Sequence, residues 1–450
     1  MSSAEHQPRS VVEATEDWAN ARVSMSDRHS TLSIIAARMG FTVSATDLLY
    51  GIALGLYFPF WTALLVALGS SIVISIVSIL CGLMGQREGI TTALCMRLTF
   101  GKEGVRLPAL AIAVISAGFA GYSTGITANV LPGDSNLSNL LYCVGLGVIY
   151  TAICIVGFGR GLTWVGRISV PLMLGMVLIA TVAAINHAGG WDGIVTATPV
   201  QAGELTVLAM LGLGINKWMT GATVTPDVMR FGRTKSSVYS STLAEFLVGN
   251  FGFNLLGIIV GLGVGIGDLG EAFAVIGVGI LAVAAVFVQG FPHEVNNMYA
   301  ASLAGRTAAG LPRLYINIIS GLIVISVGYY GVSQGILDSF LGYLGWLGYV
   351  IPLIPGILIA DYFLVRRRNY GADIEDVGAF NPRAVTAFTV GLGLNLILGL
   401  TLDDTLWRAL PLLGFVLYLL LSIPQLRKAW SKTDTATPSQ EIPTAANTDQ

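Results

Sequence analysis

A lysine and a tryptophan stand side by side at the end of an apolar run: Lys217 and Trp218, in GINKWMTGATVTPDVMRFG (214–232). An ammonium group near the centre of a bilayer costs about 2.5–3.5 kcal/mol on insertion scales, so we expect it to face the protein interior with a partner. Asp47, in RMGFTVSATDLLYG (38–51), is the candidate counter-ion. A static ion pair that only ties two helices together is the alternative, and the sequence leaves it open.

Two aromatic side chains are candidates for holding a flat ring, Phe119 and Trp218. A planar heterocycle gains stacking and buried area between two aromatic rings. Phe119 lies in SAGFAGYSTGITAN (116–129), where Ser116 and several glycines leave room beside it. Aromatic residues in apolar helices more often serve core packing, so the interpretation depends on these neighbours.

The segment VQGFPHEVNNMYAASL (288–303) concentrates hydrogen-bonding groups within an apolar stretch, among them Gln289, His293 and Glu294. Such groups need partners in hydrocarbon, and a substrate or an ion could be one. Histidine titrates near physiological pH, so His293 could carry a proton, as could the carboxyl group of Glu294. A histidine that is simply hydrogen-bonded is the alternative.

Nothing in the sequence predicts catalysis. It contains no GxxxxGK[ST] phosphate loop, no HExxH, no GxSxG and no CxxC. The four cysteines lack metal-ligand spacing. We therefore expect neither an enzyme nor a cofactor, no nucleic-acid partner and no obligate protein partner, and any transport would be driven by a gradient.

The elements that must position these residues are membrane helices. The chain has 450 residues, 54% of them hydrophobic and 11% charged, with a mean hydropathy of +0.73. A helix needs about 20 mostly apolar residues to span a bilayer, and hydropathy predicts about twelve such spans. They are expected at 32–56, 60–84, 105–130, 138–158, 165–187, 204–226, 238–265, 272–303, 314–330, 335–365, 384–402 and 407–424.

The basic residues predict the orientation of these spans. If the chain starts in the cytoplasm, every lysine and arginine of the 24 falls in a turn on that side except Arg38, Lys217 and Arg408. This asymmetry is the one that cytoplasmic loops show. The first 30 residues lack the apolar core of a secretion signal. We therefore expect both termini in the cytoplasm and the protein in the inner or plasma membrane.

Two segments, 38–51 and 216–227, are interrupted in the middle by glycine, small hydroxyl residues and a charge, and they lie five spans apart. Transporters built from inverted repeats place broken helices at corresponding positions, where freed backbone groups line substrate and ion sites. The alternative is that small residues merely allow close helix packing. Because each segment also contains one half of the Asp47 and Lys217 pair, we favour a site.

At these residues the chain resembles the nucleobase–cation symporter family (purine/cytosine permeases), most closely its bacterial cytosine permease branch. Four stretches are most similar: EGITTALCMRLTFG (88–101), TVTPDVMRFGR (223–233), NNMYAASL (296–303) and IPGILIADYFLVRRRNY (354–370). The resemblance implies an all-α integral membrane protein of the leucine-transporter type. We expect a cytoplasmic segment (1–30), two inverted five-helix repeats (31–187 and 188–368), two further helices (369–430) and a disordered cytoplasmic tail (431–450).

The resemblance also implies roles for single residues. Phe119 stands where the permease has a stacking tryptophan, and Trp218 stands where it has the facing aromatic residue. Three polar positions depart from the family: Ser116 replaces a glutamine, Lys217 a small residue and Glu294 an asparagine. Because an ammonium group favours a carbonyl or anionic oxygen, these changes favour a more acidic or oxygen-rich ring over cytosine itself.

This chain departs further from the family at the positions of the family's sodium site. It uses backbone carbonyls of the first broken helix, here around Gly40 and Ser44, and two hydroxyl residues of the eighth span, here Pro292 and His293. Neither of these two supplies a hydroxyl oxygen, and hard cations prefer oxygen ligands. We expect weakened or absent sodium binding, with Lys217, Asp47, His293 or Glu294 giving either proton coupling or a fixed internal charge instead.

The expected function is import of a small planar heterocycle by alternating access. The ring would be a purine, a pyrimidine, allantoin or a hydantoin-like compound, and Na⁺ or H⁺ would be the coupling ion. Its expected contacts are Phe119, Trp218, Lys217, Ser116, Asp47, Glu294 and Gln289. An amino-acid or amine transporter of the same fold, and a passive facilitator or channel, remain open because fold does not settle substrate.

Overall fold

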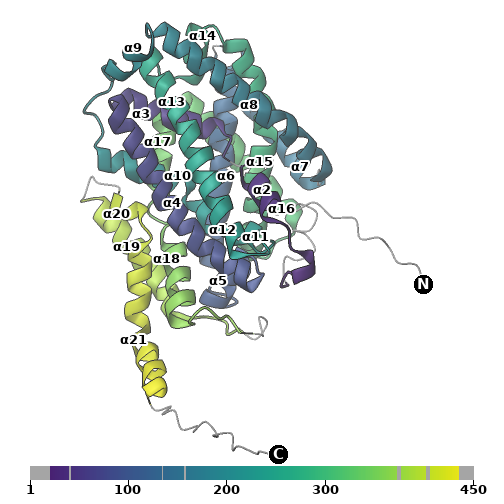
Figure 1. Ribbon diagram of the computed structural model, residues 1–450. Coiled ribbons are helices and arrows are strands. Elements are labelled where there is room, and N and C mark those ends of the chain that lie inside the picture. The colour runs from purple at the N-terminus through teal and green to yellow at the C-terminus, as the bar shows by residue number, and fades with distance from the viewer. Residues whose placement is uncertain are drawn as a thin grey trace, which may run out of the picture.

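The computed structural model describes residues 21–39, 42–133, 135–156, 159–371, 377–401 and 406–434, and these are almost entirely helical (Figure 1). The all-α prediction is confirmed. Among the described residues, seven helical segments are long and apolar enough to cross a membrane. They are α4 (Phe60–Glu88), α6 (Arg106–Val130), α7 (Asn136–Val156), α8 (Gly159–His187), the run Lys235–Val264, α16 (Arg313–Ser333) and α19 (Pro382–Gly399).

The first predicted span is interrupted as expected. It forms α2 (Thr31–Met39) and α3 (Ala45–Tyr57), and the described residues between them, 42–44, are not helical. The sixth span is interrupted near the end of the predicted segment 216–227, because α10 (Val207–Thr223) continues without a break through Lys217. The chain leaves the helix only at Val224 and Thr225, before α11 (Pro226–Met229). Proline has no N–H for a helical hydrogen bond, which accounts for an interruption here rather than in the middle of the segment.

Two irregularities escaped the sequence analysis. The tenth span is divided at residues 348–352 into α17 (Ile336–Leu347) and α18 (Leu353–Ile359), and α18 continues as the π-helix η3 (Ala360–Val365). In the seventh, a π-helix, η2 (Ala244–Asn250), joins α12 (Lys235–Leu243) to α13 (Phe251–Val264). Wider π turns inside α-helices often occur at functional sites.

Most of the remaining predicted spans coincide with helices, with two corrections. The twelfth span, predicted at 407–424, is divided by a turn at 410–411 between α20 (Leu406–Ala409) and α21 (Leu412–Asp434). The eighth span begins later than predicted, since 269–275 forms the separate helix α14 (Leu269–Val275), and α15 (Gly279–Ala309) starts after a turn at Gly277 with φ +76°. Shorter elements complete the described chain: η1 (Met25–Asp27), α5 (Thr92–Phe100), α9 (Trp191–Thr196), α20 (Leu406–Ala409) and α21 (Leu412–Asp434). The total of twelve spans, the inverted repeat and the domain boundaries stay predictions.

Helix α3 lies in the middle of the bundle, and every one of its residues is buried. Glycines let it approach α13 until the two backbones touch. A Cβ on Gly51 would lie 2.3 Å from the carbonyl oxygen of Asn254, and one on Gly257 would lie 2.4 Å from that of Leu48. This close packing brings Asn254 of α13 within hydrogen-bonding distance of Lys217.

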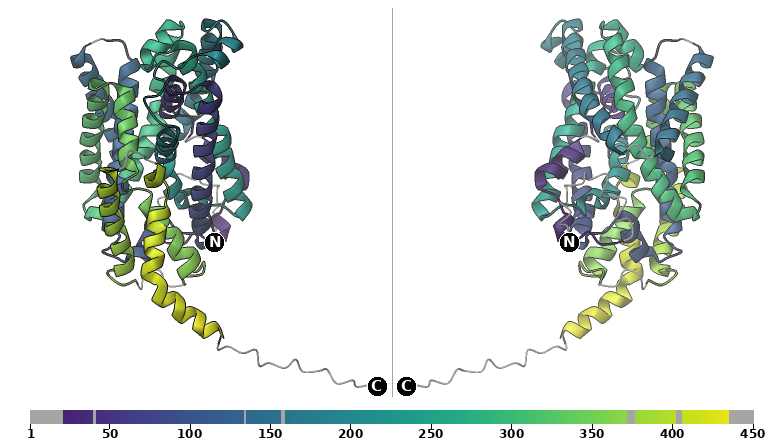
Figure 2. Two further views of the ribbon diagram at one scale, coloured as in Figure 1. Left: turned by 90° about the vertical axis from the view of Figure 1, so that its left-hand side faces the viewer. Right: turned by 90° about the vertical axis from the view of Figure 1, so that its right-hand side faces the viewer.

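The segment before α2 crosses one end of the bundle. Val23 donates its backbone N–H to Gly89 at 2.8 Å, and His29 donates to Phe231 at 2.7 Å. The buried guanidinium of Arg28 donates to the carbonyl of Gln86 at 2.6 Å. Helix α21 leaves the bundle at the same end (Figure 2), so the first and last described segments lie on one side. The cytoplasmic location of that side stays a prediction.

Candidate functional site

Asp47 is positioned by the start of α3. Ser44 caps this helix: its Oγ accepts the backbone N–H of Asp47 at 3.2 Å and donates to Asp47 Oδ2 at 2.7 Å. A carboxylate in the first turn of a helix is also favoured by the helix dipole. The interrupted helix therefore holds Asp47 in place from its own N-terminus. Gly40, expected to belong to the cation site, lies outside the described residues.

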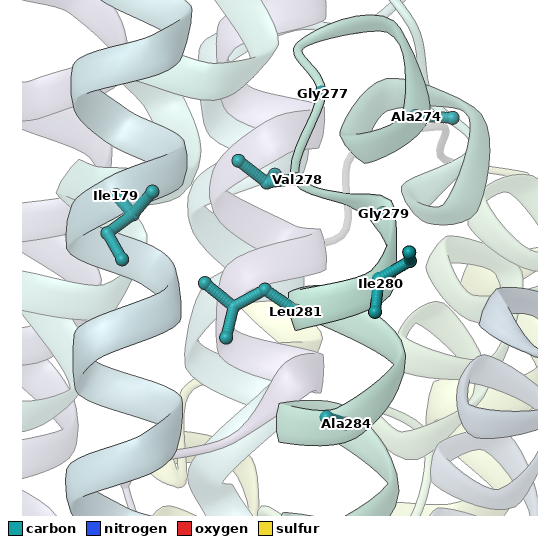
Figure 3. A pocket seen from close by; sticks show the side chains of 8 residues that line it. All are labelled: Ile179, Ala274, Gly277, Val278, Gly279, Ile280, Leu281 and Ala284. Atoms are coloured by element: carbon teal, nitrogen blue, oxygen red, sulfur yellow. The ribbon is translucent and has the colours of Figure 1, made fainter.

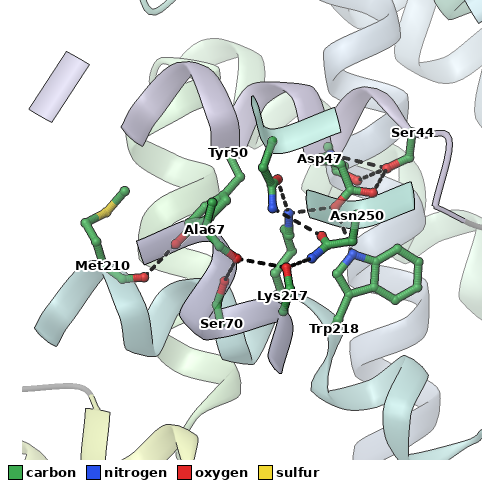
Figure 4. A network of polar contacts seen from close by, with 12 residues as sticks. Ser44, Asp47, Tyr50, Ala67, Ser70, Met210, Lys217, Trp218 and Asn250 are labelled. Carbon is green, nitrogen blue, oxygen red and sulfur yellow. Dashed lines mark hydrogen bonds and ion pairs between the residues drawn. The ribbon is translucent and has the colours of Figure 1, made fainter. Parts of the chain in front are cut away.

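Lys217 meets Asp47 inside the bundle (Figure 4). Its Nζ lies 2.6 Å from Asp47 Oδ1, and the two side chains are each 1% exposed. Nζ also donates to Asn254 Oδ1 at 2.8 Å and stands 4.5 Å from the centre of the Tyr50 ring. An ammonium group has three N–H donors, and these three neighbours can satisfy all of them. Asp47, the predicted partner, is thus beside Lys217. Asn254 and Tyr50 are two further partners that were not predicted.

Trp218 reaches the same carboxylate. Its indole Nε1 donates to Asp47 Oδ1 at 2.8 Å, so one oxygen atom accepts from both Lys217 and Trp218. The half-buried indole packs edge-on against Phe246 of η2, with ring centroids 5.7 Å apart. A Cβ on Gly221 would lie 2.7 Å from the indole ring, so the missing side chain there makes room for it.

The polar network continues into α13 and α4. Asn254 donates to Asn250 Oδ1 at 3.4 Å, and Asn250 donates to Ser71 Oγ at 2.8 Å. These three residues are fully buried. Asn250 and Asn254 were not predicted as site residues, although two amides four residues apart in an apolar span share one helix face and could have indicated them.

Phe119 is placed apart from this network. Its ring packs edge-on against Tyr343, at 5.5 Å between centroids, and against Phe340, at 6.4 Å. Among the described residues, no ring contact joins it to Trp218. Ser116, one turn earlier on α6, is buried. Phe119 and Trp218 therefore do not stack on each other. Two rings that hold a substrate ring between them must be separated in this way.

The eighth-span residues divide between two faces of α15. Gln289 donates its side-chain N–H to the carbonyl of Val43 at 2.7 Å, inside the interruption between α2 and α3. His293 is within electrostatic range of Asp47. Glu294 has no exposed surface, and neither carboxyl oxygen has a hydrogen-bonding partner among the described residues. Ser123 and Asn297 are its polar neighbours.

A second buried ion pair lies next to the first. Arg38, in the last turn of α2, pairs with Glu245 of η2 and donates to Ser78 Oγ at 3.0 Å. The guanidinium stands 6.0 Å from the Phe246 ring, which contacts Trp218. The sequence placed Arg38 in a span without a partner. Glu245 lies 207 residues away, inside a different apolar span.

An apolar surface groove of about 680 Å³ lies elsewhere, between α8 and the turn that joins α14 to α15 (Figure 3). Only glycine and aliphatic residues line it: Ile179, Ala274, Gly277, Val278, Gly279, Ile280, Leu281 and Ala284. None of these residues has a hydrogen-bonding side chain, so only backbone groups could contact the polar edge of a heterocycle there. Within the described ranges there is also no cluster of histidine, cysteine and acidic residues suited to a metal ion.

Comparison with known proteins gives consistent matches. A family model described as "Permease for cytosine/purines, uracil, thiamine, allantoin" matches residues 34–420. The cytosine permease of Escherichia coli (strain K12) is 25% identical, over 84% of this chain and 88% of that protein. The allantoin permease of Bacillus subtilis (strain 168) is also 25% identical, over 80% of this chain and 83% of that protein.

The fold is similar to that of solved transporters. The inward-facing conformation of Mhp1 superposes with a TM-score of 0.72 at 18% identity, covering 92% of this chain and 94% of that one. Mhp1, described as a nucleobase-cation-symport-1 family transporter, in a closed conformation with bromovinylhydantoin bound, gives a TM-score of 0.69 at 17% identity, covering 92% and 96%. At such identities the likeness shows the shared fold.

Proposed function

We propose, from the premise that this chain belongs to the family of permeases for cytosine/purines, uracil, thiamine and allantoin, that it imports a planar heterocycle by alternating access. The family consists of membrane permeases, so the chain is a transporter and not an enzyme. The proposed substrate is a nucleobase or a related ring such as allantoin or a hydantoin, moved together with a cation. The protein would sit in the inner or plasma membrane with both termini in the cytoplasm.

The observation that carries this proposal is the fixed position of Trp218 at the interrupted first span. Its indole is half-buried and held by Asp47, and a stacking ring at a broken helix suits a flat substrate. Phe119 is the proposed second ring. Ser116, Gln289 and Glu294 are the proposed polar contacts. Within the described residues, the carboxyl oxygens of Glu294 make no hydrogen bond of standard geometry, although Ser123 and Asn297 lie nearby.

The contacts of Lys217 alter the expected substrate preference. An acidic or oxygen-rich ring was expected because a free ammonium group would attract it. The ammonium donors are already used by Asp47, Asn254 and Tyr50. We therefore propose that Glu294, and not Lys217, selects the substrate, and that it favours rings with N–H donors, which a carboxyl oxygen can accept.

Binding of a flat ring should quench the fluorescence of Trp218. Adding cytosine or allantoin to the purified protein is expected to lower tryptophan fluorescence, and Trp218→Ala is expected to abolish that change. Loss of a stacking ring should weaken binding by about 1–3 kcal/mol, because stacking of a base on an aromatic side chain is worth that much. Titration of fluorescence against ligand measures both effects.

The matched control is Trp61→Ala, because Trp61 is 62% exposed on the bundle surface. It should leave the quenching in place. Quenching that survives Trp218→Ala would contradict the proposed stacking. If neither compound, nor uracil, shifts the unfolding temperature of the wild-type protein, an amino-acid or amine substrate becomes the better hypothesis, since ligand binding raises apparent stability.

We propose protons as the coupling ion in preference to sodium. The carbonyl of Val43, in the interruption that would supply sodium ligands, already accepts the amide of Gln289. Pro292 and His293 bring no hydroxyl oxygen to this region. His293 near Asp47, and the fully buried Glu294, are ionisable groups that could bind and release a proton during transport.

Gradients imposed one at a time on proteoliposomes test this proposal. Uptake of radiolabelled cytosine or allantoin should follow an inward proton gradient and persist when choline replaces sodium on both sides. Glu294→Gln should reduce proton-driven accumulation more than exchange at equal concentrations, because exchange needs no net ion movement. Uptake that strictly requires a sodium gradient would refute proton coupling and leave the rest of the proposal standing.

A further inference from the structure

Lys217 and Trp218 are adjacent on α10, yet both reach one oxygen atom of Asp47. Neighbouring residues on an α-helix point about 100° apart, since 3.6 residues make a turn. Their side chains can converge only on a group that lies over the helix between them. Asp47 occupies that place because α3 packs on α13 and its side chains reach α10, where Tyr50 also donates to the carbonyl of Met210 at 2.7 Å.

Both oxygen atoms of the Asp47 carboxylate have polar partners in the network. Oδ2 accepts from Ser44, and Oδ1 accepts from Lys217 and from the indole N–H. The side chain is 1% exposed, so it offers almost no surface to a substrate. The partner of Asp47 that does reach partly open space is Trp218, which is half-buried.

We propose that Asp47 is a positioning residue that sets the plane of the Trp218 ring, and that Lys217 is the counter-charge that holds Asp47 in place. The inference rests on the proposed function, in which Trp218 stacks on the substrate. The χ2 torsion of tryptophan has a broad energy profile, so an anchored N–H restricts the ring to one orientation. A ring ordered before the substrate arrives costs less entropy on binding.

Two neutral double variants separate the anchor from the charge. Asp47→Asn with Lys217→Met keeps an oxygen that can accept the indole N–H. Asp47→Leu with Lys217→Met removes it. Neither variant leaves a buried charge unpaired, so both are expected to fold, which thermal unfolding checks. Each is made with Trp218 present and again with Trp218→Phe, which has a ring but no N–H donor.

The expected result is a loss of affinity that depends on the indole N–H. With Trp218 present, the Leu variant should bind cytosine or allantoin about tenfold more weakly than the Asn variant, a difference of about 1.4 kcal/mol. With Trp218→Phe, the two should bind equally. Equal affinities with Trp218 present, or a tenfold difference that persists with Trp218→Phe, would overturn the inference.

A spectroscopic measurement distinguishes this inference from the proposed function. Near-ultraviolet circular dichroism reports whether an indole is held in one orientation. The signal that Trp218→Phe removes from the wild-type spectrum should persist in the Asn variant and vanish in the Leu variant. If the signal persists in the Asn variant and vanishes in the Leu variant, while neither the wild-type protein nor any variant binds cytosine or allantoin, the substrate assignment fails and the positioning role stands. If the signal is the same in both variants, the positioning role fails.

Discussion

Replacing Asp47 by leucine alone should lower the free energy of unfolding by about 3–5 kcal/mol, and adding Lys217→Met should restore most of that loss. The single change leaves the Lys217 ammonium buried beside Asn254 and Tyr50, neither of which carries a compensating charge. The double change removes both charges, which avoids that penalty. Thermal or denaturant unfolding in detergent would measure the stabilities of the wild-type protein, Asp47→Leu and the double variant, and so their order.

An exposed ion pair provides the control. Glu103 and Arg106 lie 2.9 Å apart with side chains 43% and 57% exposed. Glu103→Leu should cost no more than about 1 kcal/mol, because surface pairs contribute little. A single Asp47→Leu variant as stable as the double variant would show that the ammonium finds another partner or reaches water.

Arg38→Met should also cost about 3–5 kcal/mol, with much of it recovered in Arg38→Met combined with Glu245→Leu. Arg38 and Glu245 are 2% and 3% exposed, and the single change leaves a buried carboxylate beside Phe246. The Arg38–Glu245 pair joins α2 to η2, and the double variant lacks it. Backbone hydrogen exchange of α2 should therefore be faster in the double variant than in the wild-type protein, even if global stability recovers. Unfolding and exchange measurements together check both parts.

Arg22→Met is the matched comparison for this second pair. Arg22 bonds Glu88 at 2.8 Å, but its side chain is 33% exposed, so water can replace part of the interaction. We expect a smaller loss than for Arg38→Met. If the two changes cost the same, burial does not determine the strength of the Arg38 pair.

The pairing of Asp47 with Lys217 could be predicted from the sequence because the choice was narrow. A charge in an apolar span requires a partner, and the two interrupted segments each carried one. The same reasoning left Arg38 unpaired, since Glu245 lies in a span that showed no interruption. The second break lies near the end of the predicted segment 216–227, because small residues permit an interruption without requiring it, whereas Pro226 ends the helical hydrogen bonding.

Composition and hydropathy by themselves determined a helical membrane protein with buried charges in specific segments, because hydrocarbon excludes unpaired backbone and charged groups whatever the tertiary arrangement. Only the tertiary structure decided that Asn254 and Tyr50 complete the environment of Lys217, that Trp218 shares an oxygen with it, and that Gln289 reaches Val43. These contacts depend on how helices distant in sequence approach and rotate against one another. Local sequence patterns do not specify how distant helices pack. For α3 and α13 the packing depends on backbone contact at Gly51 and Gly257.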